Sequence, residues 1–341
     1  MKVSSMKYQL ERCVWEITLA CCFNCKYCGS RAGRARKNEL TTDECLDVAR
    51  QLAELKCGRV ILIGGEAFLR NDWDIIAKEL VRNGVDTSII TNGFLMDDKL
   101  IKRIKDAGLE AIGVSLDGIE WIQDKYRHEG SYKRAIDAIE ALKANNIQTA
   151  IVSTLNSESS KHLPELYEVL KQYDNIYAWQ IQACSPMGNA DSGFDYKFSH
   201  KDVVEFTASI AKDSPFRIHL GDNIGYFTEQ ENMVRGDLSG YLRFPGCTAG
   251  LSTIGIDSIG NVRGCESMYD ESFIEGNLRN QKLRDIWEAP DAFAYNRKFN
   301  EGMLTGKCST CKYGFMCAGG CRSYNHFTHG KLYEAKFCAK E

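Results

Sequence analysis

Three cysteines near the N-terminus have the spacing of a metal-binding motif. Three residues separate Cys21 from Cys25, and two residues separate Cys25 from Cys28. Three thiolates on one short loop can hold an iron-sulfur cluster or, less characteristically, a zinc ion. In a four-iron cluster, three cysteines leave one iron without a protein ligand. The triplet therefore predicts a metal centre with one position open to another molecule.

A second set of cysteines lies in the last third of the chain. Twelve residues separate Cys247 from Gly260, and four more separate Gly260 from Cys265. A compact group of four cysteines, from Cys308 to Cys321, comes later, with two, five and three residues between successive cysteines. The set consists of Cys247, Cys265, Cys308, Cys311, Cys317, Cys321 and Cys338. The compact group also suits a zinc ribbon, so spacing alone leaves iron-sulfur and zinc sites open.

The composition is that of an ordinary globular protein. The chain has 341 residues, of which 44% are hydrophobic and 26% charged, enough for one large domain and a smaller one. A net charge of -3 without a basic tract disfavours a nucleic-acid partner, and no apolar run approaches the ~20 residues of a membrane span. No secretory leader precedes residue 14, so we expect reduced cysteines and a cytoplasmic protein.

Between residues 14 and 186, short apolar runs alternate with amphipathic stretches. The sequence Thr41–Glu44 has the pattern of a capping box, which predicts the start of a helix. Gly108 and Asn146 are residue types that adopt the left-handed conformation after the last turn of a helix, so they predict two helix ends. We expect strands at 14–19, 60–63, 87–91, 111–116, 149–155 and 179–183, and helices at 42–56, 72–83, 97–107, 132–145 and 163–173. This order predicts an α/β fold, a partial (β/α)6 TIM-like barrel with its ligand site at the carboxyl ends of the strands.

The chain divides into four predicted parts. They are an N-terminal extension at 1–13, the barrel at 14–190, a connector at 191–246 with a helix at 201–212, and a small cysteine-rich domain at 247–341. Such a domain depends on bound metal more than on a large apolar core. Within it, Gly260 predicts a tight hairpin turn between 254–257 and 261–263.

On this strand order, the triplet resembles the signature of the radical SAM superfamily, in which an aromatic residue, here Tyr27, precedes the last cysteine. The resemblance implies that Cys21, Cys25 and Cys28 hold a 4Fe-4S cluster whose open iron binds S-adenosylmethionine (SAM). One electron then cleaves SAM to methionine and a 5'-deoxyadenosyl radical. Cys22 lies off the spacing and is not expected to be a ligand.

Further matches to the superfamily follow successive strands. The Gly-Gly-Glu sequence after the second strand resembles the motif that accepts the methionine amino group, although Ala67 stands where proline is frequent. A hydroxyl after the fourth strand implies a ribose contact, and a later arginine implies a contact with the methionine carboxylate. The implied SAM contacts are Tyr27, Gly64, Gly65, Glu66, Asn92, Ser115 and Arg127.

The seven later cysteines resemble the pattern of the SPASM domain, which binds two auxiliary 4Fe-4S clusters. The resemblance implies interleaved ligands: one cluster is held by Cys308, Cys311, Cys317 and Cys338, and the other by Cys247, Cys265 and Cys321. The fourth ligand of the latter cluster stays open. Because the bonds close long loops, the loss of one cysteine should destabilise the domain.

Two further residues are candidates for substrate chemistry. Glu266 directly follows Cys265, where sulfatase-maturing relatives have an acidic residue that takes a substrate proton; a solvated loop carboxylate is the alternative. Cys184 follows the sixth predicted strand, where a thiol could donate a hydrogen atom as in radical epimerases; a core cysteine is the alternative.

The resemblance implies an enzyme that abstracts hydrogen from a peptide, preferably a ribosomally made one, and forms a carbon-carbon, ether or thioether crosslink or oxidises a side chain. Alternatives are peptide epimerisation, dehydrogenation or epimerisation of a small molecule such as a sugar, an aminocyclitol or a tetrapyrrole precursor, and a non-enzymatic iron-sulfur or zinc protein. About thirteen residues precede the first predicted strand, too few for the leader-binding domain of some maturases, so we expect a separate leader-recognition protein or the barrel itself to recognise a leader peptide. The reductant would be a flavodoxin or ferredoxin.

Overall fold

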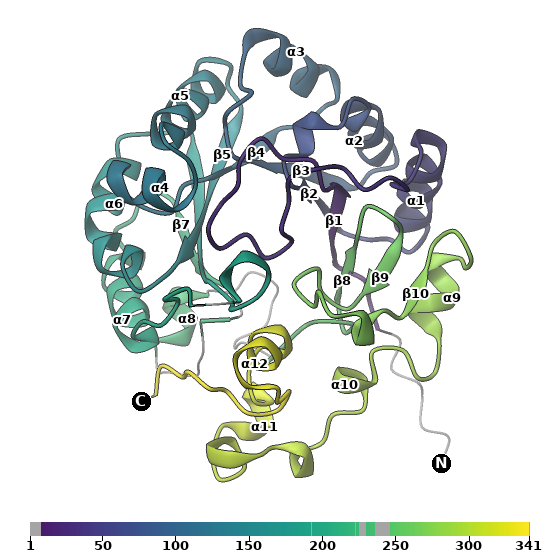
Figure 1. The fold of residues 1–341 in the computed structure, drawn as a ribbon, viewed down its shortest axis with the longest axis vertical. Coiled ribbons are helices and arrows are strands. Elements are labelled where there is room, and N and C mark those ends of the chain that lie inside the picture. Colours follow the sequence, from purple (N-terminus) through teal and green to yellow (C-terminus); the bar gives the residue numbers. More distant parts are fainter. Residues whose placement is uncertain (1–7, 192, 222, 225–229, 236–245, 341) are drawn as a thin grey trace.

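A sheet of ten strands forms the frame of the molecule in the computed structural model, which describes residues 8–340 except 192, 222, 225–229 and 236–245. The spatial order is β10-β9-β8-β1-β2-β3-β4-β5-β6-β7 (Figure 1). The strands are β1 Arg12–Thr18, β2 Arg59–Gly64, β3 Asp86–Thr91, β4 Ala111–Ser115, β5 Gln148–Leu155, β6 Ile176–Ala183, β7 Arg217–Leu220, β8 Thr253–Ile256, β9 Asn261–Arg263 and β10 Gly276–Asn277. Strands β1 to β7 pair in parallel with their neighbours.

Helices cover the outside of the curved sheet and leave its inner face toward the centre of the molecule (Figure 1). They are α1 Thr42–Glu54, α2 Trp73–Arg82, α3 Asp98–Asp106, α4 Glu120–Tyr126, α5 Ser131–Ala144, α6 Leu163–Leu170, α7 His200–Ala211, α8 Glu231–Val234, α9 Leu283–Glu288, α10 Ala294–Arg297, α11 Gly314–Cys317 and α12 Arg322–His329. The predicted α/β fold with a partial barrel is confirmed.

Successive side chains of β1 point alternately to the hydrophobic core and to the interior of the barrel. Cys13, Trp15 and Ile17 are fully buried in the large core cluster. Val14 lies between them in sequence and lines a cavity inside the barrel. Because successive strand residues point to opposite faces, Glu16 also faces inward, where it is buried.

The local end signals predict the turns well. Thr41 and Glu44 form the expected capping box, with the Thr41 N–H donating to Glu44 Oε2 at 2.7 Å. Gly108 and Asn146 take left-handed backbone conformations after their helices, with φ of 79° and 56°. Gly260, with φ of 88°, turns the chain between the antiparallel strands β8 and β9, as predicted.

The sheet is larger than the six strands predicted. Residues 217–220 form a seventh parallel strand, β7, in the region expected to be a connector. Strand β8 of the cysteine-rich region then pairs in parallel with β1, so that Arg12 lies opposite Thr253 and Trp15 opposite Ile256. The C-terminal region thus extends the barrel sheet itself.

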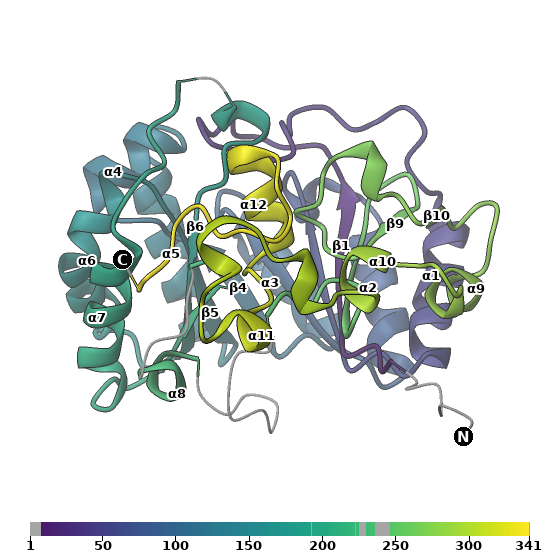
Figure 2. The same ribbon diagram turned by 90° about the horizontal axis from the view of Figure 1, so that it is seen from below.

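The C-terminal elements close the open side of the barrel. Helices α10, α11 and α12 lie between the two ends of the arc of outer helices (Figure 1), and in the second view α12 lies beneath the loop that follows β1 (Figure 2). Within the described ranges, no helix is both long enough and apolar enough to span a membrane.

Candidate functional site

The three N-terminal cysteines line one cavity at the carboxyl ends of the parallel strands. This cavity, which we name the triplet cavity, has a volume of about 290 Å³. Side chains from the ends of β2, β3, β4, β5 and β6 complete its wall. Its lining includes Cys21, Tyr27, Cys25, Cys28, Gly64, Gly65, Asn92, Ser115, Arg127, Cys184 and Glu266. The structure therefore brings together nearly all of the residues predicted for SAM and substrate.

A second loop holds the triplet loop in place. The Asn189 side chain donates to the carbonyl oxygen of Cys25 at 2.8 Å, and its backbone N–H donates to that of Cys28 at 2.9 Å. These bonds restrain the backbone between two of the predicted ligands. Asn189 was not found from the sequence, because one asparagine in a loop gives no pattern.

Glycine is required at positions 64 and 65 because the backbone there lies against the backbone of residues 18–21. A Cβ atom on Gly65 would lie 2.3 Å from the Ala20 carbonyl oxygen and 2.7 Å from the Cys21 Cβ, and one on Gly64 would lie 2.4 Å from the Thr18 oxygen. Any side chain would push the two loops apart. The glycines thus bring the end of β2 directly against the start of the triplet loop.

Glu66 is buried beside the triplet cavity but does not line it. Its Oε1 accepts hydrogen bonds from the Thr91 hydroxyl at 2.9 Å and the Phe68 N–H at 3.4 Å, and its Oε2 accepts from the Asn92 N–H at 2.8 Å. Burial raises the pKa of Glu66 to about 7, against the lowering effect of these bonds. A carboxylate has about four acceptor positions, so one direction remains for a further donor.

Asp117 links three parts of the site. It follows β4 and is 1% exposed, and its two oxygens accept from Arg127 at 2.5 and 3.0 Å. The Tyr27 hydroxyl and the Thr154 N–H also donate to this carboxylate. Arg127 therefore reaches the triplet cavity as a charge already paired, with further N–H donors available. Asp117 was not among the predicted site residues.

Cys184 lies where the sequence suggested, directly after β6 and in the wall of the triplet cavity. It is 1% exposed and packs with Tyr27 and Ala190. Burial, with a smaller effect from Asp117, raises the pKa of Cys184 to about 12. The residue is therefore a protonated thiol at neutral pH.

Three of the later cysteines line a second cavity inside the barrel, which we name the lumen cavity. Its volume is about 270 Å³, and its lining includes Cys247, Cys265 and Cys321. Side chains of the parallel strands also line it, among them Val14, Ile61, Ile90, Gln180 and His219. The triplet and lumen cavities share lining residues, among them Ile63, Gln182 and Glu266, so they adjoin.

The other four cysteines gather in a separate place. Cys317 packs against Cys338, and the Ala335 N–H donates to Cys308 Sγ at 3.3 Å. Burial raises the pKa of Cys317 to about 12, and the charges of Cys338, Cys308 and Cys311 add to this effect. Cys308, Cys311, Cys317 and Cys338 thus lie near one another, and none of them lines the lumen cavity.

Glu266 lies at the junction of the two cavities. No hydrogen bond within the described residues holds its carboxylate, and burial, followed by the charge of Glu16, raises its pKa to about 7. Glu16 is itself fixed by the Arg36 guanidinium and the Tyr269 hydroxyl. This Glu16 network joins β1, the triplet loop and the C-terminal region, and the sequence pattern did not reveal it.

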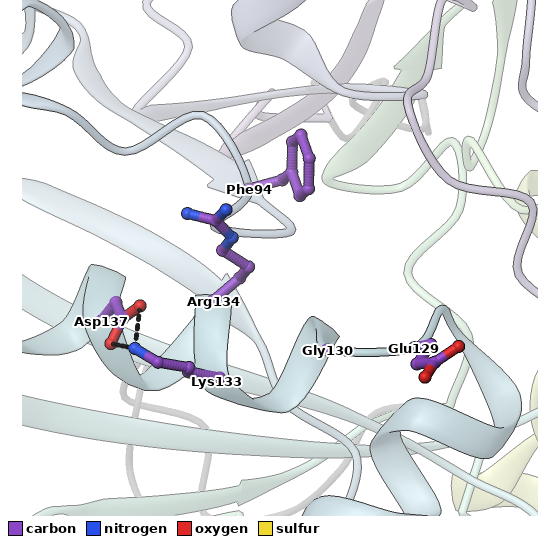
Figure 3. Close-up of a pocket in the computed structure, with 6 residues that line it drawn as sticks. All are labelled: Phe94, Glu129, Gly130, Lys133, Arg134 and Asp137. Atoms are coloured by element: carbon purple, nitrogen blue, oxygen red, sulfur yellow. Dashed lines mark hydrogen bonds and ion pairs between the residues drawn. The ribbon is translucent and has the colours of Figure 1, made fainter.

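A larger pocket of about 400 Å³ lies outside this site, at the start of α5 (Figure 3). The Arg134 guanidinium lies 5.1 Å from the centre of the Phe94 ring, and Lys133 pairs with Asp137 at 2.8 Å. None of the predicted site residues lines it. We therefore place the candidate site in the two adjoining cavities.

The donors around these cavities fit iron-sulfur clusters. Every predicted metal ligand is a thiol, the donor that such clusters use, and no disulfide joins any of the fifteen cysteines. In a cluster each thiolate binds a different iron, so its cysteines stand apart around a space. Within the part of the chain that the structure describes, no three His, Cys, Asp or Glu side chains are placed to hold a single metal ion.

Comparison with known proteins agrees with both halves of this arrangement. Residues 15–170 match the radical SAM superfamily, and residues 247–312 match the SPASM iron-sulfur cluster-binding domain. The first match contains the triplet and the predicted SAM contacts. The second contains Cys247, Cys265, Cys308 and Cys311.

Two curated relatives cover most of the chain. An AdoMet-dependent heme synthase of Methanosarcina barkeri is 26% identical over 337 residues, which is 95% of both chains. The mycofactocin maturase MftC of Mycolicibacterium smegmatis is 26% identical over 92% of this chain and 78% of its own.

The same fold is present in SuiB of Streptococcus suis. The SAM-bound structure of SuiB aligns with a TM-score of 0.76 at 18% identity, covering 97% of this chain and 76% of SuiB. The structure of SuiB with its precursor peptide SuiA aligns with a TM-score of 0.74 at 17% identity and the same coverage. Taken with the cysteine geometry, these matches show that the chain belongs to the radical SAM superfamily and carries a C-terminal SPASM domain.

Proposed function

We propose that this radical SAM enzyme modifies a ribosomally made peptide by removing hydrogen, forming a carbon-carbon, ether or thioether crosslink or oxidising a side chain. The observation that carries the proposal is the continuity of the triplet and lumen cavities. Together they run from the loop ends into the barrel and are walled by amide side chains such as Gln180, Gln182 and Asn223. Such a space suits an extended chain with many amide groups.

Three 4Fe-4S clusters would be held by the ten patterned cysteines. Cys21, Cys25 and Cys28 would hold the SAM-binding cluster, and Cys247, Cys265 and Cys321 the auxiliary cluster beside the lumen cavity. Cys308, Cys311, Cys317 and Cys338 would hold the other auxiliary cluster. SAM on its cluster supplies a 5'-deoxyadenosyl radical, and the auxiliary clusters supply an acceptor for one electron.

SAM would lie along the wall of the triplet cavity. Gly64 and Gly65 allow the cofactor to approach the backbone, and Glu66 offers its one remaining acceptor direction to the methionine amino group. Arg127 has unused N–H donors for the methionine carboxylate. Tyr27, Asn92 and Ser115 complete the proposed contacts.

Glu266 would act as the base of the reaction. A crosslink removes two hydrogens from the peptide: one leaves as an atom to the 5'-deoxyadenosyl radical, and the other leaves as a proton, with its electron passing out of the substrate. A carboxylate with a pKa of about 7, at the junction of the two cavities and held by no hydrogen bond from the described residues, is suited to take that proton.

Epimerisation is the alternative within peptide chemistry. Cys184 lies in the wall of the triplet cavity as a buried thiol. It could return a hydrogen atom to the substrate radical with no net oxidation of the peptide, leaving a thiyl radical that an external electron and a proton must restore. Incorporation of solvent deuterium distinguishes this reaction from crosslinking.

A tetrapyrrole is the second candidate substrate, because one relative that spans the chain is a heme synthase. Tetrapyrrole precursors carry several carboxylates and need cationic side chains. Among the described residues of the two cavities, the charged groups are Arg12, Arg127 and Glu266, and Arg127 is neutralised by Asp117. This lining favours the peptide, as do the mycofactocin maturase and the peptide-bound structure of SuiB.

A separate leader-recognition protein would present the peptide, and a flavodoxin or ferredoxin would supply electrons. We expect these encounters in the cytoplasm, where thiols stay reduced.

The first experiment is anaerobic reconstitution followed by reaction with dithionite and SAM. We expect about 12 irons per chain and release of 5'-deoxyadenosine. Conversion of Cys21, Cys25 and Cys28 to Ala should abolish the product and leave roughly eight irons. Saturation near four irons would contradict the assignment of the auxiliary clusters.

The second experiment uses the short peptide encoded beside the enzyme's gene. A crosslink reduces the peptide mass by two hydrogens, whereas epimerisation in deuterated water replaces one hydrogen by deuterium at each changed residue and so increases the mass by about one unit per residue. Cys184→Ala should leave crosslinking active and abolish epimerisation. A peptide that is unchanged while a tetrapyrrole is consumed would overturn the proposal.

A further inference from the structure

Arg322 is a fully buried cation that has no carboxylate partner among the described residues. It is the first residue of α12, directly after Cys321, and its side chain is 0% exposed. Its guanidinium donates hydrogen bonds to backbone carbonyl oxygens. By contrast, the strongly buried Arg70, Arg127 and Arg263 each pair with an aspartate, at 2.8, 2.5 and 2.8 Å.

The hydrogen bonds of Arg322 hold the segment that joins the two sets of predicted auxiliary ligands. Its Nη1 donates to the carbonyl oxygens of Ala318 at 2.7 Å and Gly320 at 3.1 Å. Ala318 directly follows Cys317, a predicted ligand of one auxiliary cluster. Gly320 directly precedes Cys321, a predicted ligand of the other. The guanidinium therefore fixes the short link between the two proposed cluster sites.

Packing also places the guanidinium between these two sites. Nη1 donates to the Leu332 carbonyl oxygen at 3.2 Å, and Leu332 packs against the apolar group that contains Cys247. The central carbon of the Arg322 guanidinium lies 4.6 Å from the centre of the Tyr333 ring, which packs against the apolar group that contains Cys308. Cys247 and Cys308 are predicted ligands of different auxiliary clusters.

A buried cation without a counter-charge is unfavourable, because carbonyl dipoles and aromatic rings replace only part of its hydration. Iron-sulfur clusters held by thiolates carry net negative charge, and reduction by one electron makes that charge more negative. A nearby cation therefore stabilises the reduced cluster more than the oxidised one, which raises the reduction potential.

We infer that Arg322 is the counter-charge of the auxiliary clusters and raises their reduction potentials, so that they can accept the electron that leaves the substrate. The inference rests on the proposed function, in which Glu266 takes the proton and an auxiliary cluster is reduced by one electron; an electron-carrier protein then reoxidises it. Arg322 lines neither the triplet cavity nor the lumen cavity. It is therefore a positioning residue that acts through the clusters.

Redox titration of the reconstituted holoenzyme, followed by EPR of the reduced clusters, tests the inference. Arg322→Gln and Arg322→Lys both keep an N–H donor for the carbonyl oxygens, but only lysine keeps the charge. At a fixed potential, Arg322→Gln should decrease the ratio of reduced to oxidised auxiliary cluster about tenfold, which lowers the potential by about 59 mV for one electron. Arg322→Lys should stay close to the wild type.

The titration is repeated in a chain with Cys21, Cys25 and Cys28 converted to Ala. All cluster signals of that chain come from the auxiliary clusters, so the shift caused by Arg322→Gln can be assigned to them. The shift should have the same size in both backgrounds.

Arg70→Gln is the matched control. Arg70 is also buried, and it donates to the carbonyl oxygens of Ile17 at 2.9 Å and Leu40 at 2.7 Å. These partners and Asp72, with which it pairs, all belong to the N-terminal part of the chain. Arg70→Gln should lower the midpoint of thermal unfolding and leave the potentials of the auxiliary clusters unchanged.

The outcomes separate the inference from the proposed function. Equal potentials in the wild type and Arg322→Gln, or the same shift in Arg322→Lys or Arg70→Gln, overturn the inference alone. If Arg322→Gln loses auxiliary iron and Arg322→Lys keeps it, the charge is needed to hold the clusters and the inference is supported. Loss of iron from both variants shows a role in shape only and overturns it.

The wild type tests the proposed function itself. Saturation near four irons contradicts the auxiliary clusters, and the inference fails with them. About 12 irons without release of 5'-deoxyadenosine contradicts the proposed radical reaction, while the comparison of potentials still decides whether Arg322 acts on the clusters.

Discussion

Asp117 compensates a buried positive charge beside the SAM site. It is 1% exposed, and the Arg127 side chain with which it pairs is 11% exposed. Asp117→Asn leaves the guanidinium without a counter-charge in a largely water-free position. We expect a loss of about 3 kcal/mol in the free energy of unfolding, together with weaker SAM binding, measured by denaturant unfolding and equilibrium dialysis.

Asp137→Asn is the control for this prediction. Asp137 pairs with Lys133 on the surface of α5, where solvent screens the charges, so the change should be less than about 1 kcal/mol. Equal effects of the two variants would show that the Asp117 pair has no special role.

Glu66 gives the enzyme a predictable pH dependence. Burial raises its pKa from 4.5 to about 7, so between these values the folded chain keeps a proton that the unfolded chain has released. Stability therefore falls as pH rises through this window, by up to about 3 kcal/mol, and the contribution is constant outside it. Glu66→Gln should make the profile of unfolding midpoint against pH less steep, and Glu266, whose pKa burial also raises to about 7, contributes the slope that remains.

The exposed residue Glu140 on α5 supplies the comparison. Glu140→Gln should follow the wild-type profile across the same window. A Glu66→Gln profile as steep as that of the wild type would mean that another group causes the dependence.

At the residue scale, the site residues that belong to short sequence motifs could be predicted from the sequence. The cysteine sets, Gly64–Gly65 and the position of Glu266 all follow from short motifs or from their neighbours. Asp117, Asn189 and the Glu16 network escaped detection because each acts through partners distant in sequence. The sequence around a single Asp or Asn does not indicate which distant residue it will contact.

The Gly64–Gly65 turn controls the position of the triplet loop at the element scale. Gly65→Ala would place a methyl group 2.3 Å from the Ala20 oxygen, next to Cys21. We expect a loss of about 1–3 kcal/mol in stability and lower iron occupancy, measured by unfolding and by iron analysis after reconstitution.

Gly33→Ala is the control, because it adds a methyl group to the same loop at a position where there is space for it. A Cβ atom there meets nothing within 4 Å, so iron content and stability should match the wild type. If Gly33→Ala lost as much iron as Gly65→Ala, the loop would be sensitive to any substitution and the close approach would not be the cause.

Strands and helices with long apolar or amphipathic patterns were predicted correctly, whereas a strand with a short pattern was missed. The six predicted strands and the helix caps correspond to observed ones because apolar runs and capping residues are local signals. Strand β7 has four residues, Arg217–Leu220, in polar-apolar alternation, too few to distinguish from a loop. The hairpin at Gly260 was predicted, but the pairing of β8 with β1 was not, since strand patterns do not name partners.

At the scale of the whole molecule, the region around α11 is expected to depend on metal. Its apolar clusters around Cys317 and Cys308 are small compared with the barrel core. Removal of iron should therefore loosen the segment that contains these cysteines and leave the parallel strands folded. Hydrogen exchange should rise in α11 and α12 and stay low in β2 to β5.

Strand β8 provides an internal comparison for this experiment. It belongs to the SPASM domain by sequence but pairs with β1 in the sheet, so its amides should exchange slowly in both states. Uniform exposure of the whole C-terminal region would show that the domain unfolds as one unit.

The pairing of β1 with β8 also sets an order of events during synthesis. One edge of β1 meets β2, which follows soon in the chain, whereas its other edge meets Thr253–Ile256, made only after the rest of the barrel. Contacts between residues so distant in sequence form late and slowly. While the ribosome completes the chain, the edge of β1 that later pairs with β8 therefore stays unpaired, directly before the triplet loop in the sequence.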